Sequence, residues 1–389
     1  MAVAAAHPRS HAPTAGERSP APVTMVTIPK GFRDHAGVIQ TNAIQSWTRL
    51  VRPAEIILCG DDPGVREMAH STGATHRPDI EKTDLGTPLV SDAILRTARE
   101  ARTPWVCYLN GDIILDSSFA ALLARVDTRV PTLIVGRRVD VDVTTVLDLD
   151  EPDAEQKLAA IAATGTLSPS NAIDFFCFTP GPWVMNMPTF AVGRPGWDNW
   201  FMFNAVRRGV RVIDATGQLL TLHQNHGYGH VPKGTGQAWN GPEAERHRQI
   251  IGSWFCYFTI DDATHVLTPG GVRRSFTKAA WQSRVKRFRL RTTWRHLIPE
   301  NMRDEPGSIA VQPPGWPRLR VRLERLFFSL FIALVLVPLR VVRASGRACR
   351  RMLRTFIPRP LRRWLRQLIL GKDSPSPLPQ PTEPRTPPG

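Results

Sequence analysis

Residues 105–112 read WVCYLNGD, five apolar or aromatic residues followed by a polar turn. A short apolar run that ends at an Asn-Gly-Asp turn is typical of a buried strand. Ligands of parallel α/β sheets bind beyond the carboxyl ends of the strands. Asp112 is therefore predicted to lie at the ligand-binding edge of such a sheet.

Strand and helix patterns alternate on both sides of this stretch. Further strands are predicted at 24–29, 55–59, 132–135, 175–178 and 211–213, and helices at 38–51, 65–71, 89–101, 117–126, 153–164 and 200–208. Strands separated by helices indicate an α/β fold with a mainly parallel sheet flanked by helices. No P-loop and no G-x-G-x-x-G after a strand is present, which excludes the usual phosphate-binding loops.

The composition divides the chain of 389 residues into five segments. A globular domain is predicted at 23–271, because the apolar runs are concentrated there. Residues 1–22 contain no apolar run of the length that a signal peptide needs and are predicted to be a disordered leader. A basic extension is expected at 272–317, a basic apolar segment at 318–372, and a disordered Pro-rich tail at 373–389.

The formal net charge of +16 comes from the C-terminal part. Residues 1–271 carry 24 basic and 28 acidic side chains, whereas 272–296 carry nine basic and no acidic ones. Residues 318–372 carry fifteen basic side chains against Glu324 alone. Since nucleic-acid enzymes place positive charge around their site, no nucleic-acid partner is expected.

The segment 318–372 combines apolar and basic residues. The run Leu326–Leu339 is fourteen residues long, shorter than the about 20 of a membrane-spanning helix. Two basic amphipathic helices are predicted after it, at 349–357 and 361–369, and such helices lie in anionic membrane interfaces. We expect peripheral association with the inner face of the cytoplasmic membrane. A solvated or partner-packed helix pair is the alternative.

The five cysteines (Cys59, Cys107, Cys177, Cys256 and Cys349) are scattered, without a CxxC pair. Their number is odd and no export signal accompanies them, so we predict reduced thiols in a cytoplasmic protein.

Six ordered motifs resemble the glycosyltransferase 2-like proteins of the GT-A fold, over roughly residues 24–230. They are VTIPK (26–30), YLNGDIIL (108–115), GRRVDVDV (136–143), IDFFCF (173–178), FAVGRPGWDNW (190–200) and HQNH (223–226). The resemblance implies a metal-dependent transferase that moves a sugar from a UDP- or GDP-linked donor to a hydroxyl acceptor. Lipid-linked and polysaccharide acceptors both remain open.

Asp112 is the candidate metal ligand of the first motif, because a divalent cation can bridge a carboxylate to the diphosphate of a sugar nucleotide. Asn110 stands where the family has its first acid. The resemblance also implies a late histidine in the metal shell, and His223 fits that place, with His226 assigned to the sugar or acceptor. Imidazole favours Mn²⁺ over Mg²⁺. A simple turn at Asp112 and a structural role for a histidine are the alternatives.

Asp198 lies among tryptophans, where desolvation raises the pKa of a carboxyl group and suits it to proton transfer. By the resemblance it is the candidate general base of an inverting reaction. Capping of the helix 199–208 is the alternative role. Trp197 and Trp200 are candidates for stacking on sugar faces, or for the core.

The remaining site candidates follow from their places at strand ends and from the family motifs. The nucleotide-sugar contacts are expected from Thr27, Pro29, Lys30, Asp61, Asp62, Asn110, Arg137 and Arg138, and an acceptor contact from Asp174. Arg137 and Arg138 can steady phosphates, or pair with Asp140 or Asp142. Asp140-Val141-Asp142 is a second Asp-x-Asp, interpreted as an exposed strand.

Two other functions compete with sugar transfer. His223, His226 and His230 are spaced H-x2-H-x3-H, which with Asp112 or Asp198 suits a zinc hydrolase. Asn110 in the acidic position suits a catalytically inactive, membrane-associated scaffold of the same fold.

Overall fold

The computed structural model describes residues 20–226, 238–253 and 256–291. The segments predicted at 318–372 and 373–389, Cys349, His230 and most of the leader lie outside these residues. Within the described ranges, no helix is both long and apolar enough to cross a membrane.

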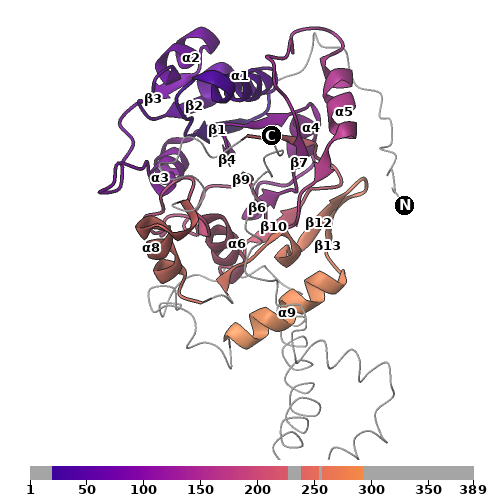
Figure 1. The fold of residues 1–389 in the computed structure, drawn as a ribbon. Helices are drawn as coiled ribbons and strands as arrows, with labels where there is room; N and C mark the ends of the chain where they lie inside the picture. The colour runs from indigo at the N-terminus through magenta and orange to yellow at the C-terminus, as the bar shows by residue number, and fades with distance from the viewer. Residues whose placement is uncertain (1–19, 227–237, 254–255, 292–389) are drawn as a thin grey trace, which may run out of the picture. The chain divides into compact units, whose positions relative to one another are not determined.

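A nine-stranded sheet forms the centre of the domain (Figure 1), in the order β13-β12-β10-β6-β9-β4-β1-β2-β3. Its strands are β1 (Val23–Thr27), β2 (Ile56–Cys59), β3 (Thr75–Arg77), β4 (Trp105–Leu109), β6 (Thr132–Val135), β9 (Phe175–Phe178), β10 (Arg211–Asp214), β12 (His265–Thr268) and β13 (Gly271–Arg274). All of the apolar runs predicted as strands form strands of this sheet, and most of their residues are buried.

The sheet is mixed, with a parallel majority. β1 lies between β2 and β4 and is parallel to both. β9 is antiparallel to its neighbours β4 and β6, and β13 is antiparallel to β12. The antiparallel β9 places the start of this strand beside the carboxyl end of β4, which brings the residue before β9 to the ligand-binding edge.

The order of strands reverses between β1 and β4. The chain runs outward from β1 through β2 to β3 and then returns to form β4 on the other side of β1. In open α/β sheets the crevice at such a reversal is where ligands bind. The ends of β1 and β4 are therefore the place where the sheet itself predicts a site.

Helices cover both faces of the sheet (Figure 1). Successive residues of a strand point to opposite faces, and because both faces of this sheet are apolar, both must be covered. One buried apolar cluster joins the sheet to residues of α1, α2 and α4, and another joins its opposite face to residues of α3, α6 and α8. The helices are α1 (Asp34–Thr48), α2 (Val65–Thr72), α3 (Val90–Glu100), α4 (Ser118–Leu123), α5 (Ala154–Thr164), α6 (Trp197–Arg207), α8 (Pro242–Ile251) and α9 (Lys278–Arg291).

A second, four-stranded sheet has the order β5-β11-β7-β8. Its strands are β5 (Ile113–Leu115), β7 (Val139–Val141), β8 (Thr166–Leu167) and β11 (Thr221–Gln224). β11 is antiparallel to β5 and parallel to β7. β5 begins directly after Asp112, and β11 pairs with it. The small sheet therefore places β11 beside the turn that follows β4.

Most element boundaries differ from the predicted ones by a few residues, and three differences matter for the fold. The helices α1 and α6 begin earlier, at Asp34 and Trp197. The domain extends past residue 271, because β13 is the edge strand of the main sheet and α9 follows it. Charge alone suggested an extension there, but β12 and β13 form a hairpin whose backbone hydrogen bonds belong to the sheet. The four described cysteines are free and buried.

Candidate functional site

Asp112 and two histidines meet beyond β4. His226 Nε2 lies 2.8 Å from Asp112 Oδ2, and His223 Nε2 lies 3.8 Å from the same oxygen. One ligand atom from each of the three residues lies within 4.8 Å of the others. Asp112 is 8% exposed, and its Oδ1 is buried with no hydrogen-bond partner among the described residues. A buried carboxylate oxygen without a partner is costly unless a ligand completes it.

The environment of Asp112 favours its ionised form. Burial alone would raise the pKa of this carboxyl group, but His226, His223 and Lys30 together hold the pKa well below its usual range. The carboxylate is therefore available as an oxygen ligand.

The strand register explains why His223 reaches Asp112 from a distant part of the sequence. In the β5–β11 ladder His223 is opposite Ile113, the residue after Asp112. In the β7–β11 ladder His223 is beside Asp140. Its Nδ1 lies 2.9 Å from Asp140 Oδ1, so that the imidazole stands between two carboxylates.

The two residues between the histidines hold this region together. Gln224 is fully buried, and its Nε2 donates to the carbonyl oxygens of Ile39, at 2.7 Å, and Asp112, at 3.2 Å. Asn225 donates its backbone N–H to Val141 O. The HQNH motif predicted the histidines, whereas the role of Gln224 was missed because it depends on contact with α1.

A set of one carboxylate oxygen and two imidazole nitrogens suits a divalent transition-metal ion, whereas Mg²⁺ and Ca²⁺ prefer all-oxygen sites. Asp112 Oδ1 has no hydrogen-bond partner among the described residues, and both histidines lie near Oδ2. These three side chains therefore fit a shared cation. The residues that could hold a cation are thus Asp112, His223 and His226, although the sequence assigned His226 to the sugar or acceptor.

Asp198 lies in the first turn of α6, after Gly196 at the N-cap position with φ 97°. Burial raises the pKa of Asp198 to about 7, with a further contribution from the charge of Asp174, while backbone hydrogen bonds oppose the rise. No side-chain hydrogen bond caps this end of α6 within the described chain. The alternative that Asp198 is the cap residue is therefore wrong, since the helix already begins at Trp197.

The loop before α6 is fixed by two buried residues of α8. His247 Nε2 accepts from the N–H of Ala191 at 2.9 Å, and its Nδ1 lies 3.1 Å from Pro195 O. Burial lowers the pKa of His247 to about 4, so this ring is neutral. Glu243 pairs with Arg194 at 2.7 Å. These contacts were missed from sequence, because nothing local in α8 points to the loop.

Asp174 connects Asp198 with the turn after β4. Asn110 donates its backbone N–H to Asp174 O at 3.0 Å and its Nδ2 to Asp174 Oδ1. Arg138 pairs with both Asp174 and Asp140, the latter at 2.9 Å. One network thus joins three residues that were predicted as separate contacts to the donor and the acceptor: Asn110, Arg138 and Asp174. Arg138 also pairs with Asp140, which was the alternative to a phosphate contact.

The end of β1 contributes Thr27, Pro29 and Lys30. Gln40 of α1 accepts from the N–H of Lys30 at 2.6 Å and donates to its carbonyl at 2.9 Å. Burial lowers the pKa of Lys30, and the charge of Asp112 opposes this shift. Thr27 is fully buried, and its Oγ1 has no partner among the described residues. Lys30 thus lies near enough to Asp112 for their charges to interact, and Thr27 Oγ1 lies near Gly111; the nucleotide contacts of both residues stay a prediction.

Other predicted residues are engaged elsewhere. Asp61 and Asp62 are exposed after β2, and Asp61 pairs with Lys82 at 2.7 Å. Arg137 donates its Nε to the carbonyl of Ser168.

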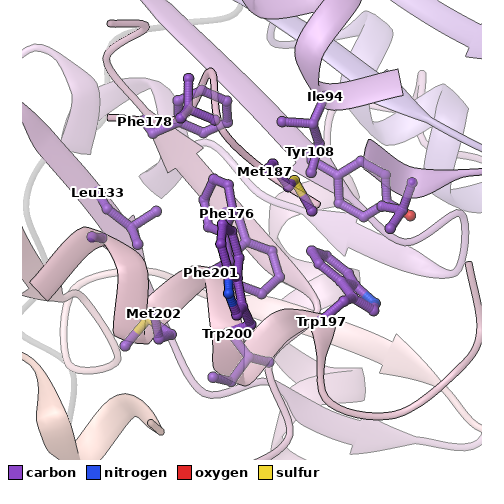
Figure 2. Close-up of a cluster of buried hydrophobic side chains, with 14 of the residues drawn as sticks. Ile94, Tyr108, Leu133, Phe176, Phe178, Met187, Trp197, Trp200, Phe201 and Met202 are labelled. Carbon is purple, nitrogen blue, oxygen red and sulfur yellow. The ribbon is translucent and has the colours of Figure 1, made fainter. Parts of the chain in front are cut away.

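The expectation that Trp197 and Trp200 stack on sugars is corrected by their burial. Trp200 is 1% exposed, and Trp197 packs edge-on against Tyr108 with ring centroids 5.2 Å apart. Figure 2 shows both indoles inside a cluster of aromatic side chains that includes Phe176 and Phe201. Their apolar area is used for the core beneath Asp198, which leaves no face for a ligand.

No protein-family model matches this sequence, and no curated protein matches it. The structure is similar to glucosyl-3-phosphoglycerate synthase from Mycobacterium tuberculosis in complex with Mg²⁺ and UDP, at 12% identity and a TM-score of 0.33, over 52% of this chain and 72% of that one. It is also similar to GalNAc-T7 with UDP, GalNAc and Mn²⁺, at 12% identity and a TM-score of 0.35, over 60% of this chain and 48% of that one. S. aureus TarS matches at 12% identity and a TM-score of 0.35, over 52% of this chain and 36% of that one.

Proposed function

We propose that this protein is a glycosyltransferase that uses a divalent cation to move a sugar from a nucleoside-diphosphate sugar to a hydroxyl acceptor. The observation that carries the proposal is the convergence of Asp112, His223 and His226 beyond β4, within 4.8 Å of one another. They meet where the strand order reverses, which is the place for a nucleotide in sheets of this kind. The GT-A-like motifs in the sequence point to the same activity.

The donor is proposed to lie across the ends of β1 and β4. Asp112, His223 and His226 would hold a divalent cation, which would neutralise negative charge on the diphosphate leaving group. Lys30, whose charge is felt by Asp112, adds a second cationic group on this side. The Thr27 hydroxyl, buried without a partner, supplies a hydrogen bond to the nucleotide.

Asp198 is proposed to act as the general base. Its carboxylate takes the proton of the acceptor hydroxyl while that oxygen forms a bond to the anomeric carbon. The bond between the anomeric carbon and the diphosphate oxygen breaks, and the diphosphate leaves with the electron pair. Attack from the face opposite the leaving group inverts the configuration. A pKa of about 7 suits this proton transfer near neutral pH.

The acceptor is proposed to be at the inner face of the cytoplasmic membrane. The support is the charge pattern of residues 318–372, with fifteen basic side chains against Glu324 alone. A lipid-linked acceptor would be presented at that surface, where such a segment binds anionic lipid.

The proposal is tested by calorimetric titration of UDP- and GDP-linked sugars with and without Mn²⁺, followed by assays of nucleotide release. We expect one donor class to bind more tightly with Mn²⁺. Asp112→Ala is expected to abolish the metal-dependent turnover. Asp127→Asn is the control, because this acid pairs with Arg129 on an exposed loop. Full metal-dependent turnover in Asp112→Ala, or the absence of binding by every donor, would contradict the proposal.

A further inference from the structure

Asp140 and Val141 of the second Asp-x-Asp are the last two residues of β7, beside β11, and Asp142 follows directly after the strand. The ladder pairs His223 with Asp140 and Gln224 with Val141. Resting on the proposed function, we propose that Asp140 is a positioning residue, which fixes the ring orientation and the tautomer of His223 for the divalent cation. Asp140 itself does not contact the cation.

The geometry of the imidazole carries this inference. His223 Nδ1 lies 2.9 Å from Asp140 Oδ1, a close contact that is not aligned as a hydrogen bond, while Nε2 is turned toward Asp112 Oδ2 at 3.8 Å. An ionised carboxylate only accepts hydrogen bonds, so the role proposed for Asp140 requires the proton of a neutral His223 to be on Nδ1. The lone pair of Nε2 then points to the proposed cation. Carboxylates that accept from the far nitrogen of a ligating histidine fix its tautomer and raise its basicity.

Asp140 is itself held from two other directions. Ser168 donates its hydroxyl to Asp140 Oδ2, and Arg138 donates its Nε to Oδ1 at 2.9 Å. The side chain of His223 is 12% exposed and that of Asp140 is 28% exposed. With both oxygens engaged, Asp140 has little freedom to rotate away, so its hold on the imidazole is rigid.

Asp142, directly after β7, offers a comparison two residues from Asp140. Its Oδ1 accepts from Asn225 Nδ2 at 2.8 Å, at an exposed position. The backbone of Asn225 is tied independently to Val141 O. Asp142→Asn therefore removes a neighbouring negative charge at an exposed position without touching an imidazole.

The experiment is Mn²⁺ titration calorimetry on the full chain without donor, in the wild type, Asp140→Ala, Asp140→Asn and Asp142→Asn. We expect Asp140→Ala to weaken Mn²⁺ binding about 10- to 100-fold. Asp140→Asn should lose less, because its amide oxygen still accepts from Nδ1. Asp142→Asn should bind as the wild type does. Side-chain ¹⁵N NMR of the metal-free protein should show His223 protonated on Nδ1, and a mixture of tautomers in Asp140→Ala.

Unchanged Mn²⁺ affinity in Asp140→Ala, or an equal loss in Asp142→Asn, would overturn the inference. If Asp140→Ala does not fold, as judged by circular dichroism, the titration of Asp140→Asn and the wild-type tautomer decide: wild-type affinity in Asp140→Asn together with protonation on Nε2 overturns it. If these outcomes are found but the wild-type protein still binds sugar nucleotide and Mn²⁺, the role of Asp140 is excluded and the proposed function is retained. A wild type that binds no Mn²⁺ removes the metal centre as well.

Discussion

Asn110 occupies the position where an Asp-x-Asp motif has its first acid. Its Nδ2 donates to Asp174 Oδ1, and its backbone N–H donates to Asp174 O. An aspartate at 110 would present a second carboxylate to Asp174 instead of a donor. Asn110 is thus explained by the presence of Asp174 and is compatible with an active enzyme, which weakens the case for a degenerate scaffold.

We predict that Asn110→Asp destabilises the protein through repulsion between the new carboxylate and Asp174. Two adjacent carboxylates raise the pKa of one of them, so the loss should be larger at about pH 8 than at about pH 5. We expect about 1–3 kcal/mol at the higher pH, measured by urea unfolding. Asn110→Ala, which removes the donor without adding a charge, should show little dependence on pH.

A second prediction concerns the pH dependence of activity. Since the pKa of Asp198 is raised to about 7, kcat/KM should rise as pH increases through about 7 and then level off. Asp198→Asn should lower kcat by about 10²- to 10⁴-fold and leave donor affinity close to that of the wild type. Rate profiles and donor titrations test both points. A flat profile between about pH 5 and about pH 8 would remove Asp198 as the base.

The same group links stability to pH. The folded-state pKa of Asp198 lies above the unfolded value of about 4, so the folded protein binds this proton more tightly. The stability from this proton is present below the unfolded pKa and is lost as pH rises toward about 7. Thermal melting should therefore show a smaller decline over this range in Asp198→Asn than in the wild type.

At the scale of elements, six of the nine strands of the main sheet could be predicted because each is a short apolar run bounded by turn residues, whereas β3, β12 and β13 contain polar residues and are only partly buried. Asp112 and His223 followed from their places at the ends of such runs. Of the small sheet, the alternation at Asp140-Val141-Asp142 indicated a strand, but the sheet itself could not be predicted, because β8 is only two residues long and exposed. The contact of Asp140 with His223 depends on the register between two strands far apart in sequence, and no local pattern encodes it. The helix α6 begins at Trp197, before the predicted start at residue 200. Gly196 takes the N-cap position with a φ of 97°, a conformation that the apolar pattern of the helix does not reveal.

The turn into α6 gives a third prediction. A Cβ on Gly196 would lie 2.6 Å from Ile251 Cδ1 and 3.2 Å from Tyr257 Cε1, and its φ of 97° also disfavours other residues. Gly209, at the other end of α6, has a φ of 79° and no atom within 4 Å of such a Cβ. Gly196→Ala should therefore reduce the free energy of unfolding by about 1–3 kcal/mol more than Gly209→Ala. Equal losses in denaturant unfolding would contradict the crowding between α6 and α8.

At the scale of the whole molecule, charge divides the chain. Residues 1–271, with 24 basic and 28 acidic side chains, contain every residue of the candidate site. Residues 318–372 carry the strongest excess of positive charge. The proposed anionic donor would thus be attracted mainly by local groups such as Lys30 and the proposed cation, because the net charge of residues 1–271 is slightly negative.

We predict that the full-length protein cosediments with vesicles containing anionic phospholipid and much less with neutral vesicles. Each basic side chain near such a surface contributes about 1 kcal/mol, and salt screens this attraction. Binding should therefore fall as ionic strength rises. Replacing the six arginines at 347, 350, 351, 354, 362 and 363 by glutamine should reduce binding, while donor affinity stays unchanged. Binding to neutral vesicles at the same level would contradict the electrostatic part of the proposal.

The pairing of β11 with β5 has a consequence for how the site forms. Gln224 and Asp112 are 112 residues apart in sequence, yet their hydrogen bond requires β11 in one alignment. A slip of β11 by a single residue turns alternate side chains to the opposite face, so an imidazole would be exchanged for Leu222 or Gln224. Misaligned chains could keep nearly all of the main sheet and still be unable to capture a cation. During refolding, recovery of metal capture is therefore a sharper sign of the native state than recovery of secondary structure.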